Sequence, residues 1–198
     1  MSINYQQVHF AAAYGTAAQL PESTRPEVSF AGRSNVGKSS LMNRLFNRRS
    51  LVKVSSKPGK TSTINFFPTD MVDFVDLPGY GFAKVSASER ARWSELMNGY
   101  FEQPRQHALV VCLIDIRHDA SPLDTQMVNY LADHQLPMAI VLTKADKLSK
   151  QKQVKQTRTL CAQLKAPGDT PVLICSSETG QGIEDLRTLI GEFVSPWA

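Results

Sequence analysis

The chain has 198 residues, of which 42% are hydrophobic and 20% charged, a composition typical of a single globular α/β domain. No segment approaches the roughly 18–20 consecutive apolar residues that cross a bilayer, and Met1 to Phe10 lack the features of a signal peptide. Cys112, Cys161 and Cys175 lack the spacing of metal ligands, and the first and last lie in apolar runs typical of a core. We therefore expect a cytoplasmic protein without a membrane partner. A monomer is expected as well.

The distribution of charge indicates an anionic partner more clearly than the net charge does. The net charge is +4 and the isoelectric point is near 9.0, a mild bias toward polyanions. From Val28 to Thr69, however, the chain contains no acidic residue. The basic residues of this stretch are Arg33, Lys38, Arg44, Arg48, Arg49, Lys53, Lys57 and Lys60. We expect something negative to approach this side of the molecule.

The first predicted strand leads directly into a phosphate-binding loop. Residues 1–26 are expected to form an extension packed on a single domain, residues 27–198, which opens with a strand at 27–31. From Gly32 to Ser39 the chain matches G-x-x-x-x-G-K-[ST] at every fixed position and opens a predicted helix at 38–47. In this motif backbone N–H groups surround the phosphates, Lys38 reaches the β- and γ-phosphates and Ser39 ligates Mg²⁺. The predicted binding residues are Gly32, Arg33, Ser34, Asn35, Val36, Gly37, Lys38, Ser39 and Ser40.

A polar loop and a hairpin come next. In a nucleotide-sensing loop one hydroxyl reaches Mg²⁺ in the triphosphate state, and Thr61 is preferred to Thr63 for this role. The predicted binding residues of the loop are Gly59, Lys60, Thr61, Ser62 and Thr63. Strands at 64–68 and 71–76 are separated by two residues, too few for a crossover, and therefore predict an antiparallel hairpin at one sheet edge.

The second hairpin strand ends in D-x-x-G, which is Asp76-Leu77-Pro78-Gly79 in this chain. A carboxylate at Asp76 can hold Mg²⁺ through a water molecule, and the Gly79 N–H can contact the γ-phosphate. Such a turn is common in isolation, but after a phosphate-binding loop and at a strand end it predicts a nucleotide contact. All four residues are predicted to lie at the nucleotide.

The motif T-K-x-D follows a predicted helix at 88–102, strand at 108–115, helix at 121–133 and strand at 137–143. Asp146 can accept hydrogen bonds from N1–H and N2–H₂ of guanine, which adenine cannot supply. Lys144 can lay its aliphatic stem over the base. Thr143, Lys144, Ala145 and Asp146 are therefore predicted to bind guanine.

The last elements are a helix at 149–164, a strand at 171–175 and a helix at 183–194. After the strand, Ser176, Ser177 and Glu178 either offer N–H groups to the guanine O6 or form an ordinary helix-capping loop. In the first of these helices the expected inward stripe is Val154, Thr157, Cys161 and Leu164. Lys152, Lys155 and Arg158 then share a different, solvated face.

These elements predict a P-loop NTPase: a three-layer α/β/α fold around a mostly parallel six-stranded sheet with one antiparallel edge strand. The motifs favour a GTP-hydrolysing switch that cycles between GTP and GDP. A GTP-binding interaction protein with negligible intrinsic hydrolysis remains the alternative. An ATP-using P-loop enzyme is disfavoured by T-K-x-D. The histidines show no spacing typical of catalysis or metal binding, and Trp93 is expected to serve packing.

The strings GRSNVGKSSLMN, KPGKTSTINFF, DLPGYGFAK, TKAD and SSETGQG resemble the EngB (YihA/YsxC) family of bacterial GTPases, within the TrmE-Era-EngA-EngB-septin-like class. The resemblance runs from about Phe10 to the C-terminus. It implies a Ras-like GTPase that acts in assembly of the large ribosomal subunit, with its rRNA and proteins as partners, and in cell division and septation. It also implies Ser39 and Thr61 as Mg²⁺ ligands, Asp76 as a ligand through water, and Lys38, Thr61 and Gly79 as catalytic residues.

Three positions modify that expectation. Thr143 stands where many GTPases have asparagine, which implies modest nucleotide affinity. Tyr80 stands where Ras-type enzymes carry the glutamine that orients water, which implies slow intrinsic turnover. By resemblance to GTPases that carry asparagine in the P-loop, Asn35 either helps to hold an activating K⁺ or only shapes the loop; both interpretations stay open.

Overall fold

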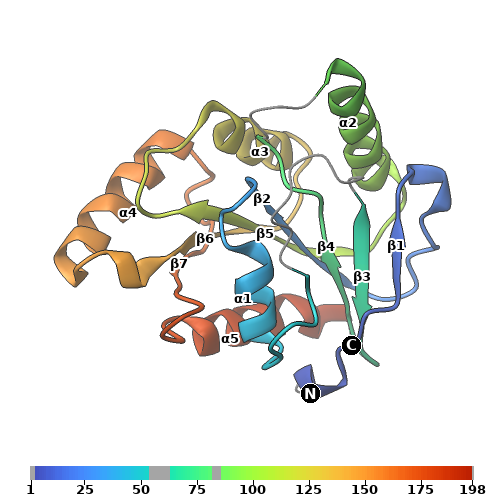
Figure 1. Ribbon diagram of the computed structural model, residues 1–198, viewed down its shortest axis with the longest axis horizontal. Coiled ribbons are helices and arrows are strands. Elements are labelled where there is room, and N and C mark those ends of the chain that lie inside the picture. The colour runs from blue at the N-terminus through green and yellow to red at the C-terminus, as the bar shows by residue number, and fades with distance from the viewer. Residues whose placement is uncertain (1–2, 54–62, 82–85, 198) are drawn as a thin grey trace.

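The computed structural model describes residues 3–53, 63–81 and 86–197, and its centre is a seven-stranded sheet in the order β1-β3-β4-β2-β5-β6-β7 (Figure 1). The strands are β1 (Ala12–Tyr14), β2 (Glu27–Gly32), β3 (Ile64–Pro68), β4 (Asp73–Asp76), β5 (His107–Asp115), β6 (Met138–Thr143) and β7 (Val172–Ile174). From β4 to β7 all neighbours pair in parallel, so their carboxyl ends gather at one edge. That edge is where α/β folds bind ligands.

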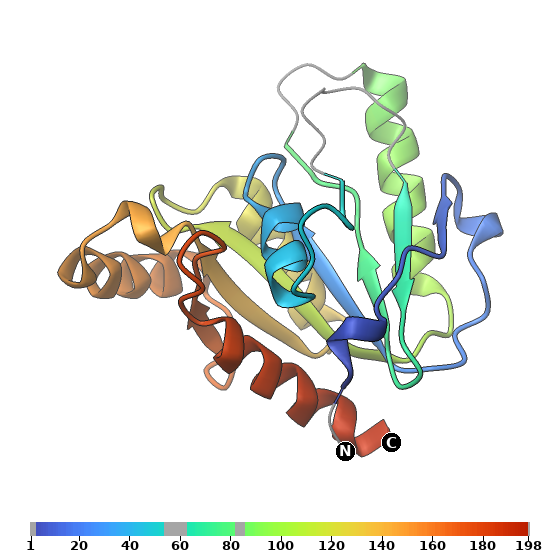
Figure 2. The same cartoon turned by 60° about the horizontal axis from the view of Figure 1, so that its bottom comes forward.

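Helices cover both faces of the sheet, as Figure 2 shows from below. They are α1 (Lys38–Leu45), α2 (Ala87–Glu102), α3 (Pro122–Asp133), α4 (Lys150–Leu164) and α5 (Ile183–Val194). Residues of α1 and α5 share a hydrophobic core with one face, and residues of α2, α3 and α4 share a second core with the other. The predicted three-layer α/β/α architecture is confirmed.

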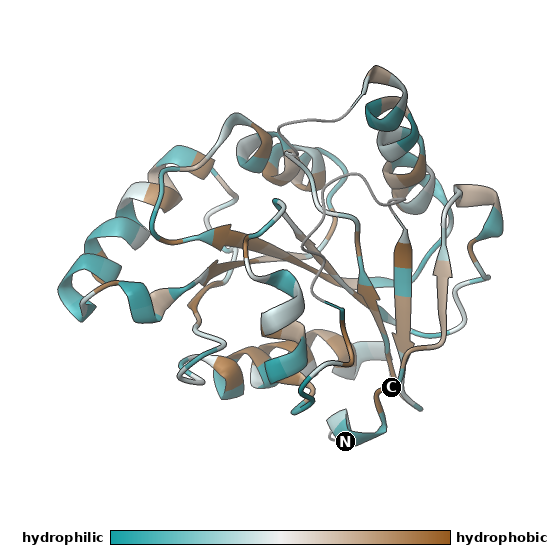
Figure 3. Ribbon diagram, in the orientation of Figure 1, coloured by the Kyte–Doolittle hydropathy of each residue, from teal (hydrophilic) through white to brown (hydrophobic). Residues whose placement is uncertain are grey.

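Local sequence explains where the helices begin. Ser86 and Ser121 cap α2 and α3 in reciprocal capping boxes with Glu89 and Asp124, which satisfy otherwise unpaired N–H groups. In the layer between the helices, β2 and β6 are buried at every position; β6 is apolar up to Thr143, as expected of a parallel strand covered on both faces, whereas β2 also buries Glu27 and Ser29 (Figure 3). Within the described residues, no helix combines the length and apolar character that a membrane crossing needs.

The sheet differs from the prediction at one edge. The 64–68 and 71–76 segments do form an antiparallel hairpin, β3 and β4, but β3 is not an edge strand. The N-terminal segment supplies β1, a seventh strand that pairs antiparallel with β3 from Ala12 to Tyr14. The six-stranded prediction missed it because three residues, two of them alanine, show no strand periodicity. Packing of Tyr14 edge-on against Phe66 across the pair, with ring centroids 5.7 Å apart, stabilises this edge.

The predicted inward stripe of α4 is wrong at two positions. Val154 is 52% exposed and Cys161 is also exposed, whereas Gln153, Leu160 and Leu164 are buried. The buried Gln153 amide donates to the Ala145 and Leu148 carbonyls at 2.8 and 3.1 Å. A fully bonded polar side chain can occupy an interior position, so hydropathy alone assigned the wrong face.

Candidate functional site

The loop between β2 and α1 has the conformation that phosphate binding requires. Asn35 and Gly37 adopt positive φ values of 64° and 100°. Gly37 stands directly before the first turn of α1, in the left-handed region that favours glycine. The loop therefore turns sharply at the start of a helix, where free N–H groups and the helix dipole attract anions.

Lys38 and Asp76 bring the P-loop and the D-x-x-G segment together. Their side chains form an ion pair in which the lysine is 12% exposed and the carboxylate 9% exposed. The other Asp76 oxygen accepts a hydrogen bond from Nδ2 of Asn65 at 3.2 Å. The Thr63 hydroxyl in turn donates to Oδ1 of Asn65 at 2.9 Å. The predicted residues Gly59, Lys60, Thr61 and Ser62 lie outside the described residues.

The D-x-x-G segment runs alongside the P-loop as a continuation of β4. The Ser34 N–H donates to the Tyr80 carbonyl at 2.8 Å, and the Tyr80 N–H donates to the Gly32 carbonyl at 3.3 Å. A Cβ atom on Gly79 would lie 3.3 Å from the Ser34 nitrogen, so the close approach of the two segments favours glycine. Because these contacts join the P-loop and the D-x-x-G segment, a displacement of one segment at the phosphates would also displace the other.

The phenol of Tyr80 points away from the phosphate edge into the layer of α2 and α3. It is 6% exposed, and its hydroxyl donates to Oδ1 of Asp124 at 3.0 Å. Burial, reinforced by the Asp124 charge, raises the pKa of Tyr80 well above its ordinary value. Trp93 packs edge-on against the Tyr80 ring and donates from Nε1 to the Pro78 carbonyl at 3.2 Å. Trp93 therefore packs, as expected, and also holds the D-x-x-G segment.

A pocket of about 160 Å³ opens beside the P-loop. Its lining residues are Gly37, Ser40, Leu41, Thr143, Lys144, Asp146, Lys147, Ser177 and Glu178. Asp146 Oδ1 accepts a hydrogen bond from the Ser176 hydroxyl at 2.7 Å, and Oδ2 pairs with Lys147 at 2.9 Å. These hydrogen bonds, first from Ser176 and then from Lys147, lower the pKa of Asp146. The pocket therefore presents an ionised, oriented acceptor.

Thr143, in the pocket wall, and Ser176, behind it, hold neighbouring parts of the pocket in place through their hydroxyl groups. The Thr143 hydroxyl is buried and donates to the Val36 carbonyl of the P-loop at 2.7 Å, which ties the T-K-x-D turn to that loop. The Ser176 N–H already donates to the Gln181 carbonyl at 3.0 Å. Ser176 therefore acts through its hydroxyl on Asp146, and the residues that line the pocket from this loop are Ser177 and Glu178.

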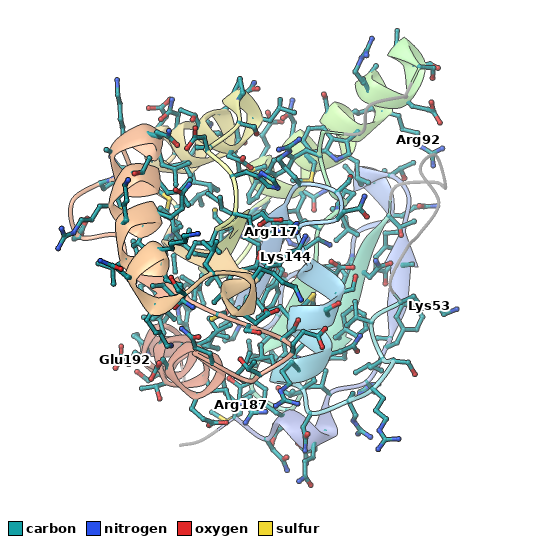
Figure 4. All side chains as sticks on the ribbon, turned by 60° about the vertical axis from the view of Figure 1, so that its left-hand side comes forward. Lys53, Arg92, Arg117, Lys144, Arg187 and Glu192 are labelled. Atoms are coloured by element: carbon teal, nitrogen blue, oxygen red, sulfur yellow. The ribbon has the colours of Figure 1, made fainter. Side chains whose placement is uncertain are left out.

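The motifs did not reveal one pair of residues, Asp115 and Arg117. Asp115 ends β5, and its carboxylate lies 2.9 Å from the Lys144 ammonium and 2.8 Å from the Arg117 guanidinium. Figure 4 shows Lys144 and Arg117 beside one another. The available signal was an acidic residue at the end of a continuous apolar run, at the edge where the other motifs lie.

The oxygen donors near Lys38 suit Mg²⁺. Ser39 follows Lys38 in the first turn of α1, and Asp76 is in contact with Lys38. A hydroxyl and a carboxylate are the hard ligands that Mg²⁺ accepts alongside phosphate oxygens. Of the three predicted metal ligands, Ser39 is thus adjacent to Lys38 in the chain and Asp76 contacts Lys38, and the third, Thr61, lies outside the described residues.

Comparison with known proteins identifies the family. A family model described as "50S ribosome-binding GTPase" matches residues 27–144. Proteins named probable GTP-binding protein EngB are 44% identical in Bacillus cereus and 46% identical in Bacillus cytotoxicus, over 88% of this chain and 89% of each relative.

Solved structures support the same fold. A crystal structure of a probable GTP-binding protein engB has a TM-score of 0.72 at 23% identity, covering 86% of this chain and 99% of that one. Era in complex with MgGDPNP and a piece of 16S ribosomal RNA has a TM-score of 0.65 at 17% identity, covering 87% and 58%. Given the family model and the two Bacillus relatives, this chain belongs to the EngB family of GTP-binding proteins and is a GTPase.

Proposed function

We propose that this GTPase is a Mg²⁺-dependent switch that acts in the cytoplasm on the large ribosomal subunit during its assembly. The observation that supports guanine nucleotide as the signal is the ionised Asp146 carboxylate in a pocket that adjoins the P-loop. With the base at Asp146, the phosphates extend toward Gly37 and Lys38. The nucleotide would therefore span the carboxyl ends of β2, β5 and β6, from the P-loop to the T-K-x-D turn.

In this proposal Lys38 exchanges one anionic partner for another. Its ammonium pairs with Asp76 in the structure and would turn to the β- and γ-phosphates when nucleotide binds. Ser39 and Asp76 are then available to hold Mg²⁺, which supplies charge neutralisation at the phosphates. Gly79, which lies beside Ser34, would contact the γ-phosphate, so a change at this phosphate would move the D-x-x-G segment that Trp93 and Tyr80 anchor. Because the Tyr80 phenol is bound to Asp124, it does not orient a water molecule, and intrinsic hydrolysis should be slow.

The proposed ribosomal partner is supported by the family model and by surface charge. Arg44, Arg48, Arg49 and Lys53 are all exposed, and among the described residues no carboxylate pairs with them. Lys53 projects outward in Figure 4. The direct test is co-sedimentation with separated ribosomal subunits. We expect binding to the large subunit with a non-hydrolysable GTP analogue and release with GDP, whereas equal binding in both states would contradict a switch.

Neutralising Arg48, Arg49 and Lys53 to glutamine should flatten the salt dependence of large-subunit binding. If these side chains meet rRNA phosphates, each contact contributes about −0.7 to −0.9 to the slope of log K against log salt. The triple variant should therefore lose about 2 units of slope while it keeps its affinity for GTP. The matched control neutralises Lys152, Lys155 and Arg158 on α4, an equal change of charge on another exposed face. A flattened slope in the control alone would assign the RNA contact to α4 instead.

Potassium should accelerate hydrolysis if Asn35 holds a monovalent cation against the phosphates. Asn35 is exposed at the tip of the P-loop, and its φ of 64° also fits a purely structural role. A cation there would stabilise transition-state charge in place of the missing glutamine, and we expect roughly tenfold faster turnover in K⁺ than in Na⁺. Phosphate release at equal ionic strength measures this. Identical rates in the two salts, or an undiminished K⁺ effect in Asn35→Ala, would remove Asn35 from this role.

A further inference from the structure

A carboxylate outside the nucleotide motifs, Asp115, lies at the centre of the contacts that hold Lys144. Asp115 is the last residue of β5 and pairs in register with Thr143. Its Oδ2 atom lies 2.9 Å from the Lys144 ammonium and 2.8 Å from Nη2 of Arg117. Its Oδ1 atom accepts hydrogen bonds from the Arg117 Nε and backbone N atoms, at 2.9 and 3.1 Å. Donors therefore occupy both oxygens of a side chain that is only 16% exposed.

The Lys144 ammonium has a second partner in the P-loop. It donates a hydrogen bond to the Asn35 carbonyl at 2.7 Å. Its Cε atom lies 3.7 Å from the position that a Cβ atom on Gly37 would take. The aliphatic stem therefore crosses the P-loop along the wall of the pocket, with its tip held by one charge and one carbonyl. A lysine stem is otherwise flexible, so these two contacts determine where it lies.

Arg117 fixes the carboxylate that holds Lys144. Its planar guanidinium meets both Asp115 oxygens in the bidentate geometry that gives direction as well as attraction. Burial by itself raises the pKa of Asp115, but hydrogen bonds from Arg117 and Lys144 outweigh it and hold the pKa well below its usual range. Asp115 is therefore ionised near neutral pH. Arg117, Asp115, Lys144 and Asn35 form one connected chain from the end of β5 to the P-loop.

We propose that Asp115, clamped by Arg117, is a positioning residue that holds the Lys144 stem in the place where it covers the guanine base. This inference rests on the assignment of Lys144 to the base in the proposed function. We call the Asp115–Arg117 pair the clamp. Because it acts on Lys144, which lies at the base and at the Asn35 carbonyl, binding of GDP and GTP should depend on it to the same extent. The rate of hydrolysis of bound GTP should not depend on it.

The direction of the effect separates positioning from simple electrostatics. Removing a negative charge beside a polyphosphate site would, by Coulomb attraction alone, strengthen nucleotide binding. Losing the order of a binding side chain weakens it, because the nucleotide must then organise its own site. Asp115→Asn keeps the shape of the side chain and removes its charge, so the two effects have opposite signs in this variant.

The experiment is a titration with N-methylanthraniloyl GDP, with the dissociation rate read after adding excess unlabelled GDP. We expect Asp115→Asn to weaken binding of GDP and of a GTP analogue by about tenfold each, mainly through faster dissociation. The value of kcat at saturating GTP should stay unchanged while KM rises. Asp73→Asn is the matched control: its carboxylate is 11% exposed, pairs with Arg25 at 3.0 Å and lies at the opposite end of the parallel strands. It should leave nucleotide affinity unchanged.

A second background tests whether Asp115 acts through Lys144. In Lys144→Met, the added Asp115→Asn change should alter GDP affinity by less than about twofold. Equal tenfold losses in both backgrounds, or unchanged or tighter binding in Asp115→Asn alone, would overturn the positioning role. If Asp115→Asn does not fold, the same titration is made with Arg117→Gln, which keeps the Asp115 carboxylate. This variant should also weaken nucleotide binding, to a smaller extent. If Lys144→Ala, which removes the aliphatic stem, leaves GDP binding unchanged, the assignment of Lys144 to the base fails and the positioning role of Asp115 fails with it.

Discussion

Asp146→Asn should lower the affinity for GTP by about 10²–10³-fold and shift the preference toward XTP. In the unmodified protein, the Asp146 carboxylate offers two acceptors to guanine N1–H and N2–H₂, and Ser176 and Lys147 orient it from behind. The amide presents a donor where guanine needs an acceptor, and losing a charged, partly buried pair of hydrogen bonds costs about 3–4 kcal/mol. Xanthine carries an oxygen at position 2 that accepts from the new amide, which partly restores binding.

Competition of GTP, ATP and XTP against labelled GDP measures this shift. Asp133→Asn, which changes an exposed carboxylate at the end of α3, is the control and should bind all three nucleotides as the unmodified protein does. Unchanged GTP affinity in Asp146→Asn would show that the base lies elsewhere. A uniform loss for all three nucleotides would indicate a damaged fold in place of altered specificity.

Arg105→Met should destabilise the protein by about 3–5 kcal/mol, because it leaves Glu27 buried without its cation. The two side chains are 2% and 0% exposed, with Arg105 Nη2 2.6 Å from Glu27 Oε1. Tyr100 donates to the other oxygen at 2.7 Å, and Arg105 also donates to the Pro21 carbonyl at 2.9 Å. The pair therefore joins the N-terminal segment, β2 and α2 at the end of the sheet remote from the nucleotide.

Thermal unfolding measures the effect of Arg105→Met, with an expected fall in Tm of roughly 6–20 °C. Arg25→Met is the matched control, since Arg25 also pairs with a carboxylate, Asp73, but is 40% exposed. A partly exposed pair contributes about 1 kcal/mol or less, so Tm should fall by only a few degrees. An equal fall in Tm in the two variants would show that burial of the Arg105–Glu27 pair adds nothing to the stability of the protein. GTP affinity of the folded protein should be unchanged in both.

The sequence predicted the features that local patterns determine. Every predicted strand and helix exists, because apolar runs and capping residues act within a few positions of the chain. The P-loop, D-x-x-G and T-K-x-D turns were found for the same reason. Strand β1 was missed because pairing with β3, and not its own three residues, defines it.

The features that the sequence did not predict depend on contacts between side chains that no local pattern records. The clamp of Asp115 on Lys144 depends on the register of β5 against β6, which no motif records. The sequence predicted from residue type that Tyr80 does not orient water, but the bond of its phenol to Asp124 on α3 could be seen only in three dimensions. Gln153 lies inside, against its hydropathy, because the Ala145 and Leu148 carbonyls accept from its amide and the Gln181 amide donates to its side-chain oxygen.

Phosphate release by the purified protein, with GTP or ATP as the substrate, tests the central claim most directly. We expect slow release from GTP in Mg²⁺, none above background from ATP, and loss of activity when Mg²⁺ is chelated. Lys38→Met, which removes the ammonium that pairs with Asp76 and would meet the phosphates, should reduce the rate by about 10²–10³-fold. Release from ATP as fast as from GTP, or full activity in Lys38→Met, would contradict a GTPase built on this P-loop and this pocket.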